Sequence, residues 1–416
     1  ERYPHQIWFE SILRLCFNIF GQNNLLPLYM LNLVSILGII FAVFKITDRI
    51  FRKSSVTIIA TILTGLSSFL VYYVPFVYGD IIGLALVLLG LWLYIDALDK
   101  PRSLKGLCVA VLLFVVGILI KSSLSIIVYA LLVHAVLLIV QQKKWRYCTA
   151  LLATVAAVYI SQLGGVALYN ARYDTNISGD TTVPKVAWIA MGLQSEAFST
   201  DTPYSVTEGH DVTKVVPAPG VFNGFVWGLP YMDKTSQGMS RISKDYLGKS
   251  IESFAKDPVF AAGFFSAKIA YTWADPTYDT RVFVSASDET VGVTRWGKVM
   301  TADAPRLLMW LADDKSKFRS ISIRIYDALQ LVVYAFAAVG FVLIARNQKE
   351  RGTARGASCL ALILLLGFVV YLLWETTARY VLPYYILMIP VAAFGLHVLT
   401  NRIWLIVKSS TEKLNR

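Results

Sequence analysis

Nine apolar segments, each long enough or nearly long enough to cross a lipid bilayer, dominate this sequence. A transmembrane helix needs about 20 mostly apolar residues. The segments are residues 25–46, 56–75, 81–98, 104–120, 124–140, 147–169, 326–345, 358–374 and 380–399. Only helices and closed barrels satisfy the whole backbone within lipid. Runs of this length therefore predict an all-α polytopic membrane protein, a helical bundle of about nine spans.

The charge distribution agrees with a membrane protein and disagrees with a nucleic-acid-binding protein. Charged residues make up 16% of the chain and hydrophobic residues 56%, whereas soluble domains carry about 25% charged residues. The net charge is +12, yet residues 170–325 hold 17 acidic and 17 basic residues. The surplus therefore lies among the apolar segments, as the positive-inside rule describes. A nucleic-acid reader more often carries a basic face on a polar domain.

Basic residues follow every second apolar segment, and this alternation orients the chain. They are Arg49, Arg52 and Lys53; Lys100, Arg102 and Lys105; Lys143, Lys144 and Arg146; Arg346, Lys349, Arg351 and Arg355; and Arg402, Lys408, Lys413 and Arg416. Cytoplasmic loops carry the excess of Lys and Arg, so residues 1–24 and 170–325 are expected outside. The chain opens without an initiator Met or a signal peptide. An outside N-terminus implies at least one span upstream.

Five parts are expected along the chain. Residues 1–24 end the first extracytoplasmic loop, 25–169 form a first transmembrane bundle, 170–325 form an extracytoplasmic cap, 326–400 form a second bundle and 401–416 are a cytoplasmic tail. The cap is expected to be largely helical, because its loop is too long for a simple connector and contains apolar-periodic stretches. Residues 6–20 predict an amphipathic helix on the outer membrane surface, with a buried helix of the outer domain as the alternative.

Several common site chemistries are not indicated. The four cysteines, Cys16, Cys108, Cys148 and Cys359, make no Cys-x-x-Cys pair and are interpreted as apolar packing residues. The four histidines, His5, His134, His210 and His397, show no metal-ligand spacing. A phosphate-cradling Gly-rich loop and a Gly-x-Ser-x-Gly elbow are both missing from the sequence. Nucleotide binding and serine-hydrolase chemistry are therefore not expected.

Ionisable residues stand in three short connections predicted on the outer side. They are Asp80, Lys121, Glu375 and Arg379. Charges at the membrane boundary are costly and tend to face a cavity or a partner, although Lys and Arg also snorkel as simple anchors. Glu375 can pair with Arg379 one helical turn on. Two cations near the outer leaflet suit a lipid phosphate. Asp80 can hold a divalent metal, orient Lys121 or help to bind an acceptor.

Short motifs in a fixed order carry a family resemblance. They are Arg2-Tyr3-Pro4-His5-Gln6, Tyr78-Gly79-Asp80, Ile120-Lys121-Ser122-Ser123 and Arg379-Tyr380-Val381-Leu382-Pro383; the long loop adds residues 184–193 and 219–224, Lys268 and Trp273-Ala274-Asp275-Pro276. Together they resemble the C-type superfamily of integral membrane glycosyltransferases. The nearest branch is similar to the bacterial, Gram-positive relatives of the polyprenyl-phosphate-mannose protein mannosyltransferases.

The resemblance implies a hexosyltransferase of the cell membrane that acts on the extracytoplasmic side. It implies inverting transfer from a polyprenyl-phosphate sugar to a cell-wall polysaccharide, lipid or protein acceptor. Lys121 and Arg379 would bind the donor phosphate, and Asp80 would support the site or hold magnesium or manganese. His5, Gln6, Tyr78, Glu375 and Tyr380 are the pocket candidates. The family's catalytic carboxylate lies in the first outer loop, so the general base is expected upstream of Glu1.

Two other function classes are weighed against this one. A flippase for lipid-linked sugars, or another transporter, would need polar residues deep within several spans or paired broken helices, and most span centres here are apolar. A polysaccharide polymerase or ligase would use a lipid-pyrophosphate donor and usually an Arg-rich outer loop. The balanced charge of residues 170–325 disfavours that class without excluding it.

Overall fold

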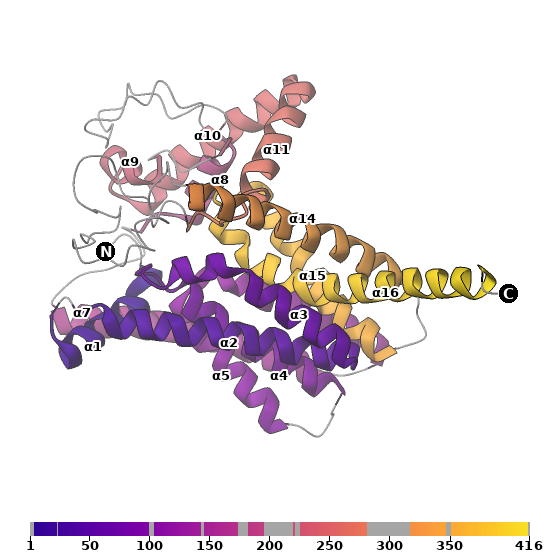
Figure 1. The fold of residues 1–416 in the computed structure, drawn as a ribbon. Helices are drawn as coiled ribbons and strands as arrows, with labels where there is room; N and C mark the ends of the chain where they lie inside the picture. The colour runs from indigo at the N-terminus through magenta and orange to yellow at the C-terminus, as the bar shows by residue number, and fades with distance from the viewer. Residues whose placement is uncertain are drawn as a thin grey trace. The chain divides into compact units, whose positions relative to one another are not determined.

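The computed structural model describes residues 4–22, 24–99, 104–142, 145–173, 182–194, 219–220, 225–280, 317–346 and 351–414. All regular elements within these ranges are helices, as predicted (Figure 1). Seven helices in this part of the chain are long and apolar enough to cross a membrane. They are α2 (Leu26–Phe51), α4 (Asp80–Asp99), α6 (Ser125–Gln142), α7 (Trp145–Tyr173), α14 (Lys317–Arg346), α15 (Arg351–Leu373) and α16 (Leu382–Leu414).

Two shorter apolar helices correspond to the other predicted spans. These are α3 (Ser54–Leu66) and α5 (Leu104–Ile120). A helix of 17 residues such as α5 is about 25 Å long, slightly less than the hydrocarbon core of a bilayer. The prediction of a multi-pass, all-α membrane protein is therefore confirmed.

The chain divides into two compact units by its internal contacts. The first unit contains Glu1–Trp8, Ile160–Asp279 and Gly367–Val381. The second unit contains Phe9–Tyr159, Thr280–Leu366 and Leu382–Arg416. Each unit is described by itself.

Helices α2 to α6, α14 and α16 all lie in the second unit. Helix α4 packs against α2 and α5, α3 packs against α2, and α16 contacts α2, α3 and α14 (Figure 1). Helix α2 shows why such helices suit lipid. Its inward face buries Ile39 and Val43 at 0% exposure, while Val34 and Leu37 on another face are 60% exposed. Because both faces are apolar, the exposed one is suited to hydrocarbon and not to water.

The predicted span at residues 56–75 is not one unbroken helix. Helix α3 ends at Leu66, and the 3-10 helix η2 (Ser68–Tyr73) follows. Non-helical backbone at membrane depth needs partners inside the protein. The buried side chain of Asn32 supplies them, because its Nδ2 donates to the carbonyls of Tyr73, Val74 and Phe76 at 3.2, 3.0 and 3.1 Å. The segment before Asp80 is thereby fixed to α2.

Replacing Asn32 by leucine should therefore destabilise the bundle. The Val74 carbonyl would lose its donor, whereas the carbonyls of Tyr73 and Phe76 would keep the backbone donors Phe76 N and Tyr78 N. One unsatisfied buried group costs about 1–3 kcal/mol, so the free energy of unfolding should fall by about that amount. The measurement is the thermal midpoint of the purified protein in detergent. Asn401→Leu, at an exposed position of α16, is the matched control and should leave the midpoint unchanged. Equal midpoints for both variants would contradict the role of Asn32.

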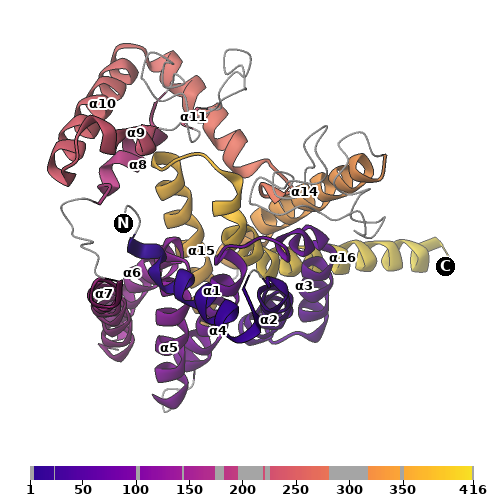
Figure 2. The same cartoon turned by 90° about the vertical axis from the view of Figure 1, so that its left-hand side faces the viewer.

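The first unit holds four helices from the long loop. They are α8 (Lys185–Gly192), α9 (Phe225–Met232), α10 (Ser236–Lys256) and α11 (Pro258–Trp273). Helices α8, α9 and α10 share a core that includes Met191, Phe225 and Met239 (Figure 2). Thr235 caps α10 by accepting from Gly238 N at 3.0 Å, and Asp257 caps α11 by accepting from Val259 N and Phe260 N. The described part of the predicted cap is helical, as expected.

Candidate functional site

Asp80 and Lys121 form a buried ion pair in the second unit. Lys121 Nζ lies 2.7 Å from Asp80 Oδ1, and the two side chains are 10% and 9% exposed. Asp80 is the first residue of α4, and Lys121 directly follows α5. The sequence placed both residues at outer helix ends, and the structure brings them into contact. The contact is what the alternative in which Asp80 orients Lys121 requires; the role of Asp80 stays a prediction.

Glycines at the crossing of α4 and α5 allow this contact. A Cβ atom on Gly83 would lie 2.9 Å from the carbonyl of Gly117 and 2.9 Å from Lys121 Cβ. A Cβ atom on Gly79 would lie 2.6 Å from the carbonyl of Ile120. No real Cβ tolerates such distances from backbone atoms. The close approach of the two helices, and with it the ion pair, therefore depends on residues without side chains.

An aromatic ring lies against the lysine. Lys121 Nζ lies over the ring of Tyr78, 4.3 Å from its centroid, which is a cation–π geometry. The Tyr78 ring in turn contacts Phe9 of α1 (Ile7–Phe20) and Phe76, at centroid distances of 6.0 and 5.8 Å. The pocket candidate Tyr78 is thus in direct contact with the ion pair. The candidates His5 and Gln6 lie in η1 (Pro4–Gln6), which belongs to the first unit.

The second carboxylate oxygen of Asp80 is the atom of this cluster that suggests a binding site. Asp80 Oδ2 is buried and has no hydrogen-bond partner among the described residues. Buried carboxylate oxygens are normally paired. A hydroxyl group or a cation would satisfy this atom. Within the described residues no three His, Cys, Asp or Glu side chains gather, so a magnesium or manganese ion here would need further oxygens from the substrate.

Helix α1 packs beside this cluster. Phe9, Leu28, Ile82 and Ile120 form one buried group, against which Ile12, Leu13, Val77 and Leu86 pack. The opposite side of α1 leaves large apolar side chains exposed, with Leu15 at 57% and Ile19 at 63%. Helix α1 therefore has one apolar face against the bundle and an exposed side that also carries apolar residues and suits lipid; its place at the outer membrane surface stays a prediction.

Three further predicted site residues lie together in the first unit: Glu375 follows α15, and Arg379 and Tyr380 belong to the 3-10 helix η6 (Ala378–Val381). The Tyr380 hydroxyl donates to the carboxylate of Glu375, which is 4% exposed. The Arg379 guanidinium lies over the Tyr380 ring, 5.3 Å from its centroid. Tyr380 also stacks on Tyr371 of α15 at 5.5 Å and 24°. The three predicted residues Glu375, Arg379 and Tyr380 thus form one supported cluster.

A fully buried lysine clamps the start of this segment. The ε-ammonium of Lys268, on α11, donates to the carbonyl of Gly192 and, at 2.5 Å, to that of Trp374. Burial lowers the pKa of Lys268 to about 7, although the nearby Glu375 carboxylate acts in the opposite direction. In the sequence, Lys268 is one of the residues that carry the family resemblance, but the sequence assigns it no role. Its partners lie 76 and 106 residues away along the chain, so spacing could not have found the clamp.

The long loop of residues 170–325 also pairs directly with this segment. Thr376 N donates to the carbonyl of Gly220 at 2.8 Å, and Thr376 Oγ1 donates to that of Pro219 at 2.6 Å. Gly220 has φ of 68°, a left-handed conformation that favours glycine. A Cβ atom on Gly220 would lie 2.1 Å from the carbonyl oxygen of Gly192. The Pro219-Gly220 motif therefore serves to hold the segment that carries Glu375 and Arg379.

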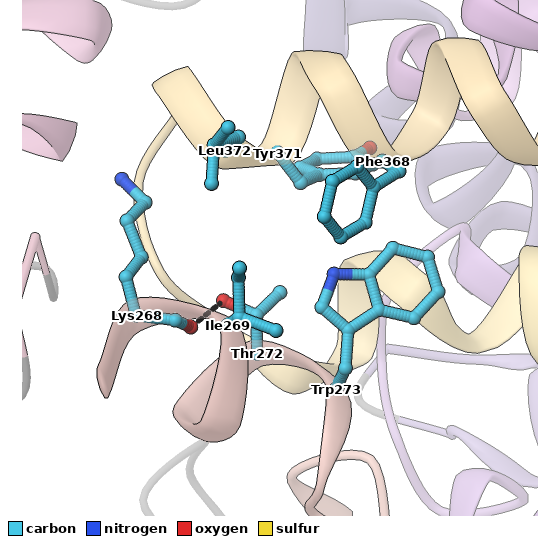
Figure 3. Close-up of a pocket in the computed structure, with 7 residues that line it drawn as sticks. All are labelled: Lys268, Ile269, Thr272, Trp273, Phe368, Tyr371 and Leu372. Atoms are coloured by element: carbon cyan, nitrogen blue, oxygen red, sulfur yellow. Dashed lines mark hydrogen bonds between the residues drawn. The ribbon is translucent and has the colours of Figure 1, made fainter. Parts of the chain in front are cut away.

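An apolar and aromatic hollow lies beside the segment, between α11 and α15. It is lined by Lys268, Ile269, Thr272, Trp273, Phe368, Tyr371 and Leu372. In Figure 3 the rings of Trp273 and Phe368 lie next to each other, tilted by 43°, and the Lys268 side chain extends away from them. The two ring centroids are 5.8 Å apart. Tyr371, which lines the hollow, also stacks on Tyr380. The stacking of Tyr371 on Tyr380 therefore supports the Arg379 cluster from the side of α15.

A carboxylate that the sequence did not single out completes the cluster. Asp279 Oδ2 accepts from the backbone N–H of Arg379 at 3.0 Å and from the hydroxyl of Thr377. The sequence offers only one hint of Asp279: it lies three residues after the Trp273-Ala274-Asp275-Pro276 motif. The structure thus shows two clusters, one around Asp80, Lys121 and Tyr78 and one around Arg379. That Asp80, Lys121 and Arg379 share one cavity for the donor phosphate stays a prediction.

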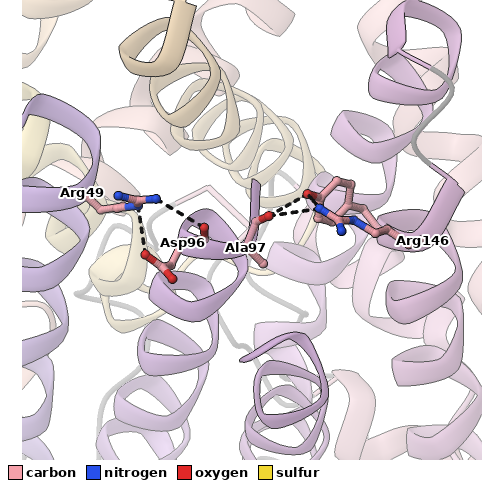
Figure 4. Close-up of polar contacts among 5 residues, drawn as sticks. Arg49, Asp96, Ala97 and Arg146 are labelled. Atoms are coloured by element: carbon pink, nitrogen blue, oxygen red, sulfur yellow. Dashed lines mark hydrogen bonds and ion pairs between the residues drawn. The ribbon is translucent and has the colours of Figure 1, made fainter. Parts of the chain in front are cut away.

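A second ion pair in the bundle unit offers a comparison. At the other end of α4, Arg49 Nε lies 3.0 Å from Asp96 Oδ1, and these side chains are 19% and 22% exposed (Figure 4). Arg146 donates to the carbonyl of Ala97 at 3.3 Å. Cations at a helix C-terminus complement its dipole. The Arg49–Asp96 pair and the Arg146 contact are therefore explained as contacts at the C-terminal end of α4. Both arginines belong to the basic loops predicted on the cytoplasmic side.

Comparison with known proteins supports the predicted resemblance over part of the chain. Residues 5–162 match the model of the family described as dolichyl-phosphate-mannose-protein mannosyltransferase. This segment contains Tyr78, Asp80 and Lys121 but not Arg379. No curated protein and no solved structure matches the chain. The family match points to a membrane glycosyltransferase that uses a polyprenyl-phosphate sugar donor; the Gram-positive subgroup stays a prediction.

Proposed function

We propose that this protein transfers a hexose from a polyprenyl-phosphate donor to an acceptor on the extracytoplasmic side of the cell membrane. The acceptor is a cell-wall glycopolymer, a lipid or a protein, and the sugar inverts at its anomeric carbon. One observation carries the proposal. The segment that matches the mannosyltransferase family contains the buried pair of Asp80 and Lys121, whose position at a helix boundary suits the head group of a membrane-bound donor.

Lys121 and Arg379 are assigned to the donor phosphate. In the transfer the acceptor oxygen bonds to the anomeric carbon, the bond from that carbon to the phosphate oxygen breaks, and a general base takes the hydroxyl proton. Polyprenyl phosphate leaves with an added negative charge. Fixed cations beside the leaving group lower the barrier because that charge develops in the transition state. Arg379 offers a fork and Lys121 a point charge for this purpose.

Asp80 has two roles in the proposal. Its Oδ1 holds the Lys121 ammonium, so that the lysine is positioned before the donor arrives. Its buried Oδ2 has no hydrogen-bond partner in the described part of the chain, and we assign this atom to an acceptor hydroxyl or to a divalent cation that bridges to phosphate. Tyr78, Glu375 and Tyr380 would line the pocket with His5 and Gln6.

The proposed function is tested by identifying the lipid that is released when the sugar is transferred. Membranes containing the protein are supplied with polyprenyl-phosphate mannose carrying a radiolabelled sugar, and with the glucose analogue in parallel. The expected result is covalent transfer of the label to a lipid-free or lipid acceptor, with one polyprenyl monophosphate released per sugar. Release of polyprenyl pyrophosphate from a pyrophosphate donor would favour the polymerase or ligase class. Movement of the intact donor across the membrane without transfer would favour a flippase.

The proposed side of the membrane gives a separate prediction. With the four native cysteines replaced, a cysteine at Ser236 of α10 should react with a membrane-impermeant maleimide on intact cells, and a cysteine at Ser54 of α3 should not. The physical reason is the alternation of basic loops, which places residues 170–325 outside. Disrupted cells serve as the control in which both positions react. Labelling at Ser54 alone in intact cells would reverse the orientation and remove the extracytoplasmic site.

A further inference from the structure

We propose that Asp275 and Asp279 form a two-carboxylate brace that fixes the backbone at Arg379, which makes Asp279 a positioning residue for the donor phosphate. The inference rests on the proposed function, because it takes Arg379 as a phosphate ligand. It concerns two residues outside the segment that matches the known family. The argument depends on contacts within the first unit alone.

The first step of the brace joins Asp279 to the Arg379 segment. One carboxylate oxygen, Asp279 Oδ2, accepts both from Arg379 N at 3.0 Å and from the Thr377 hydroxyl. These donors stand at the beginning of η6, where backbone N–H groups lack partners within the helix. A carboxylate at a helix start is a strong cap, because the bond is charge-assisted. The contact fixes the main chain of Arg379 and does not draw on its guanidinium.

The second step is the conformation of Asp279 itself. Tyr278 and Asp279 have φ of 51° and 62°, left-handed values that are uncommon for residues other than glycine. Such backbone is strained and persists where the surroundings determine it. Tyr278 is fully buried, which leaves its side chain no freedom to relax the turn. Two adjacent residues in this conformation indicate that the contacts around the turn hold it in place.

The third step shows what holds that turn. Asp275 Oδ2 accepts from Asp279 N at 2.9 Å, and Asp275 Oδ1 accepts from Thr277 N at 2.9 Å and Thr277 Oγ1 at 2.7 Å. Asp275 therefore fixes the backbone of Asp279, and Asp279 fixes the backbone of Arg379. Both carboxylates act through backbone N–H groups. The chain of contacts runs from the end of α11 to the residue assigned to the phosphate.

The brace complements the clamp at the other end of the same segment. Lys268 holds the carbonyl of Trp374, and Asp279 holds the N–H of Arg379. Glu375, just after the first point, accepts from the hydroxyl of Tyr380, just after the second. A phosphate ligand must be held within a fraction of an ångström of its productive position, or the rate falls steeply. Fixing both ends of the short segment provides that precision.

A turn that serves stability alone would contain similar bonds, so the test must separate the two roles. The separating quantity is the coupling between Asp279 and Arg379. If Asp279 acts by placing Arg379, its removal matters only while the Arg379 side chain is present. If Asp279 only supports the fold, its removal should lower transfer by the same factor with or without Arg379.

The experiment compares sugar transfer from polyprenyl-phosphate mannose by the intact protein in membranes. Asp279→Ala should lower kcat/KM about 10- to 100-fold, because a charge-assisted bond is lost at the phosphate ligand. Asp279→Asn keeps an oxygen acceptor for both donors and should recover most of the activity. In an Arg379→Ala background, Asp279→Ala should change the rate less than about twofold. Equal losses in both backgrounds, or no loss in Asp279→Ala alone, would overturn the brace.

Asp233→Ala is the matched control. Asp233 Oδ1 accepts from Thr235 N at 2.8 Å and from Thr235 Oγ1 at 2.7 Å, the same arrangement that Asp275 makes with Thr277. It precedes α10 and touches no residue of the Arg379 segment in these contacts. Asp233→Ala should therefore keep normal transfer, and a loss equal to that of Asp279→Ala would count against the proposal.

Hydrogen exchange gives a readout that does not require transfer. In Asp279→Ala the backbone amides of residues 377–381 should exchange faster than in the wild-type protein, and in Asp233→Ala they should not. If the wild-type protein transfers no sugar from polyprenyl-phosphate donors, the proposed function fails, and the exchange data still decide whether the brace exists. Unchanged exchange in Asp279→Ala would reject the brace whatever the activity.

Discussion

Arg379→Ala should lower the turnover of sugar transfer about 10- to 150-fold. The guanidinium is half-buried and lies over the Tyr380 ring, and a charge-assisted bond from such a group is worth about 1.5–3 kcal/mol. The phosphate gains negative charge as the sugar leaves, so the interaction strengthens in the transition state. The loss should therefore fall on kcat more than on donor binding.

Arg379→Lys separates charge from geometry. A lysine keeps the positive charge but cannot form the planar fork that matches two phosphate oxygens, so it should recover only part of the rate. Donor binding can be measured separately with farnesyl phosphate as a probe that cannot react. Wild-type transfer by Arg379→Ala at equal expression would reduce Arg379 to a membrane anchor and leave Lys121 as the assigned phosphate ligand.

The fold was predictable to the extent that hydropathy determines it. Long apolar runs give spanning helices because lipid permits little else, and the basic loops follow from the positive-inside rule. The irregular backbone that follows α3 was not predictable, because its carbonyls at Tyr73, Val74 and Phe76 accept from Asn32, more than 40 residues away. An asparagine within an apolar helix shows that a polar partner exists, but a sequence alone does not say where.

The candidate site was predictable only in part, for the same reason. Alternation of inside and outside loops placed Asp80 and Lys121 at the same level, but their contact depends on Gly83 and Gly117, which read in the sequence as ordinary small residues of apolar helices. Lys268 lies in a helix of mixed apolar and polar residues, where a lysine usually reaches water. Here two backbone carbonyls far along the chain make its burial possible.

Removing Lys121 should have the largest combined effect on stability and activity. Lys121→Met leaves the Asp80 carboxylate buried without its cation, and breaking a buried pair from one side costs about 3–5 kcal/mol. It also removes an assigned phosphate ligand. We therefore expect both a lower thermal midpoint in detergent and a loss of sugar transfer of at least tenfold, measured at equal amounts of folded protein.

The double variant Lys121→Met with Asp80→Asn separates these two effects. Removing both charges removes the unpaired buried carboxylate, so a large part of the thermal stability should return. Transfer should not return, because neither the cation nor the carboxylate is restored. Arg49→Met with Asp96→Asn is the matched control, since it removes an ion pair of similar length at the other end of α4. That control should cost little stability, because the pair is more exposed, and should keep transfer. If the Lys121 double variant recovered both stability and transfer, the buried pair would be structural, and the donor phosphate would have to be bound elsewhere.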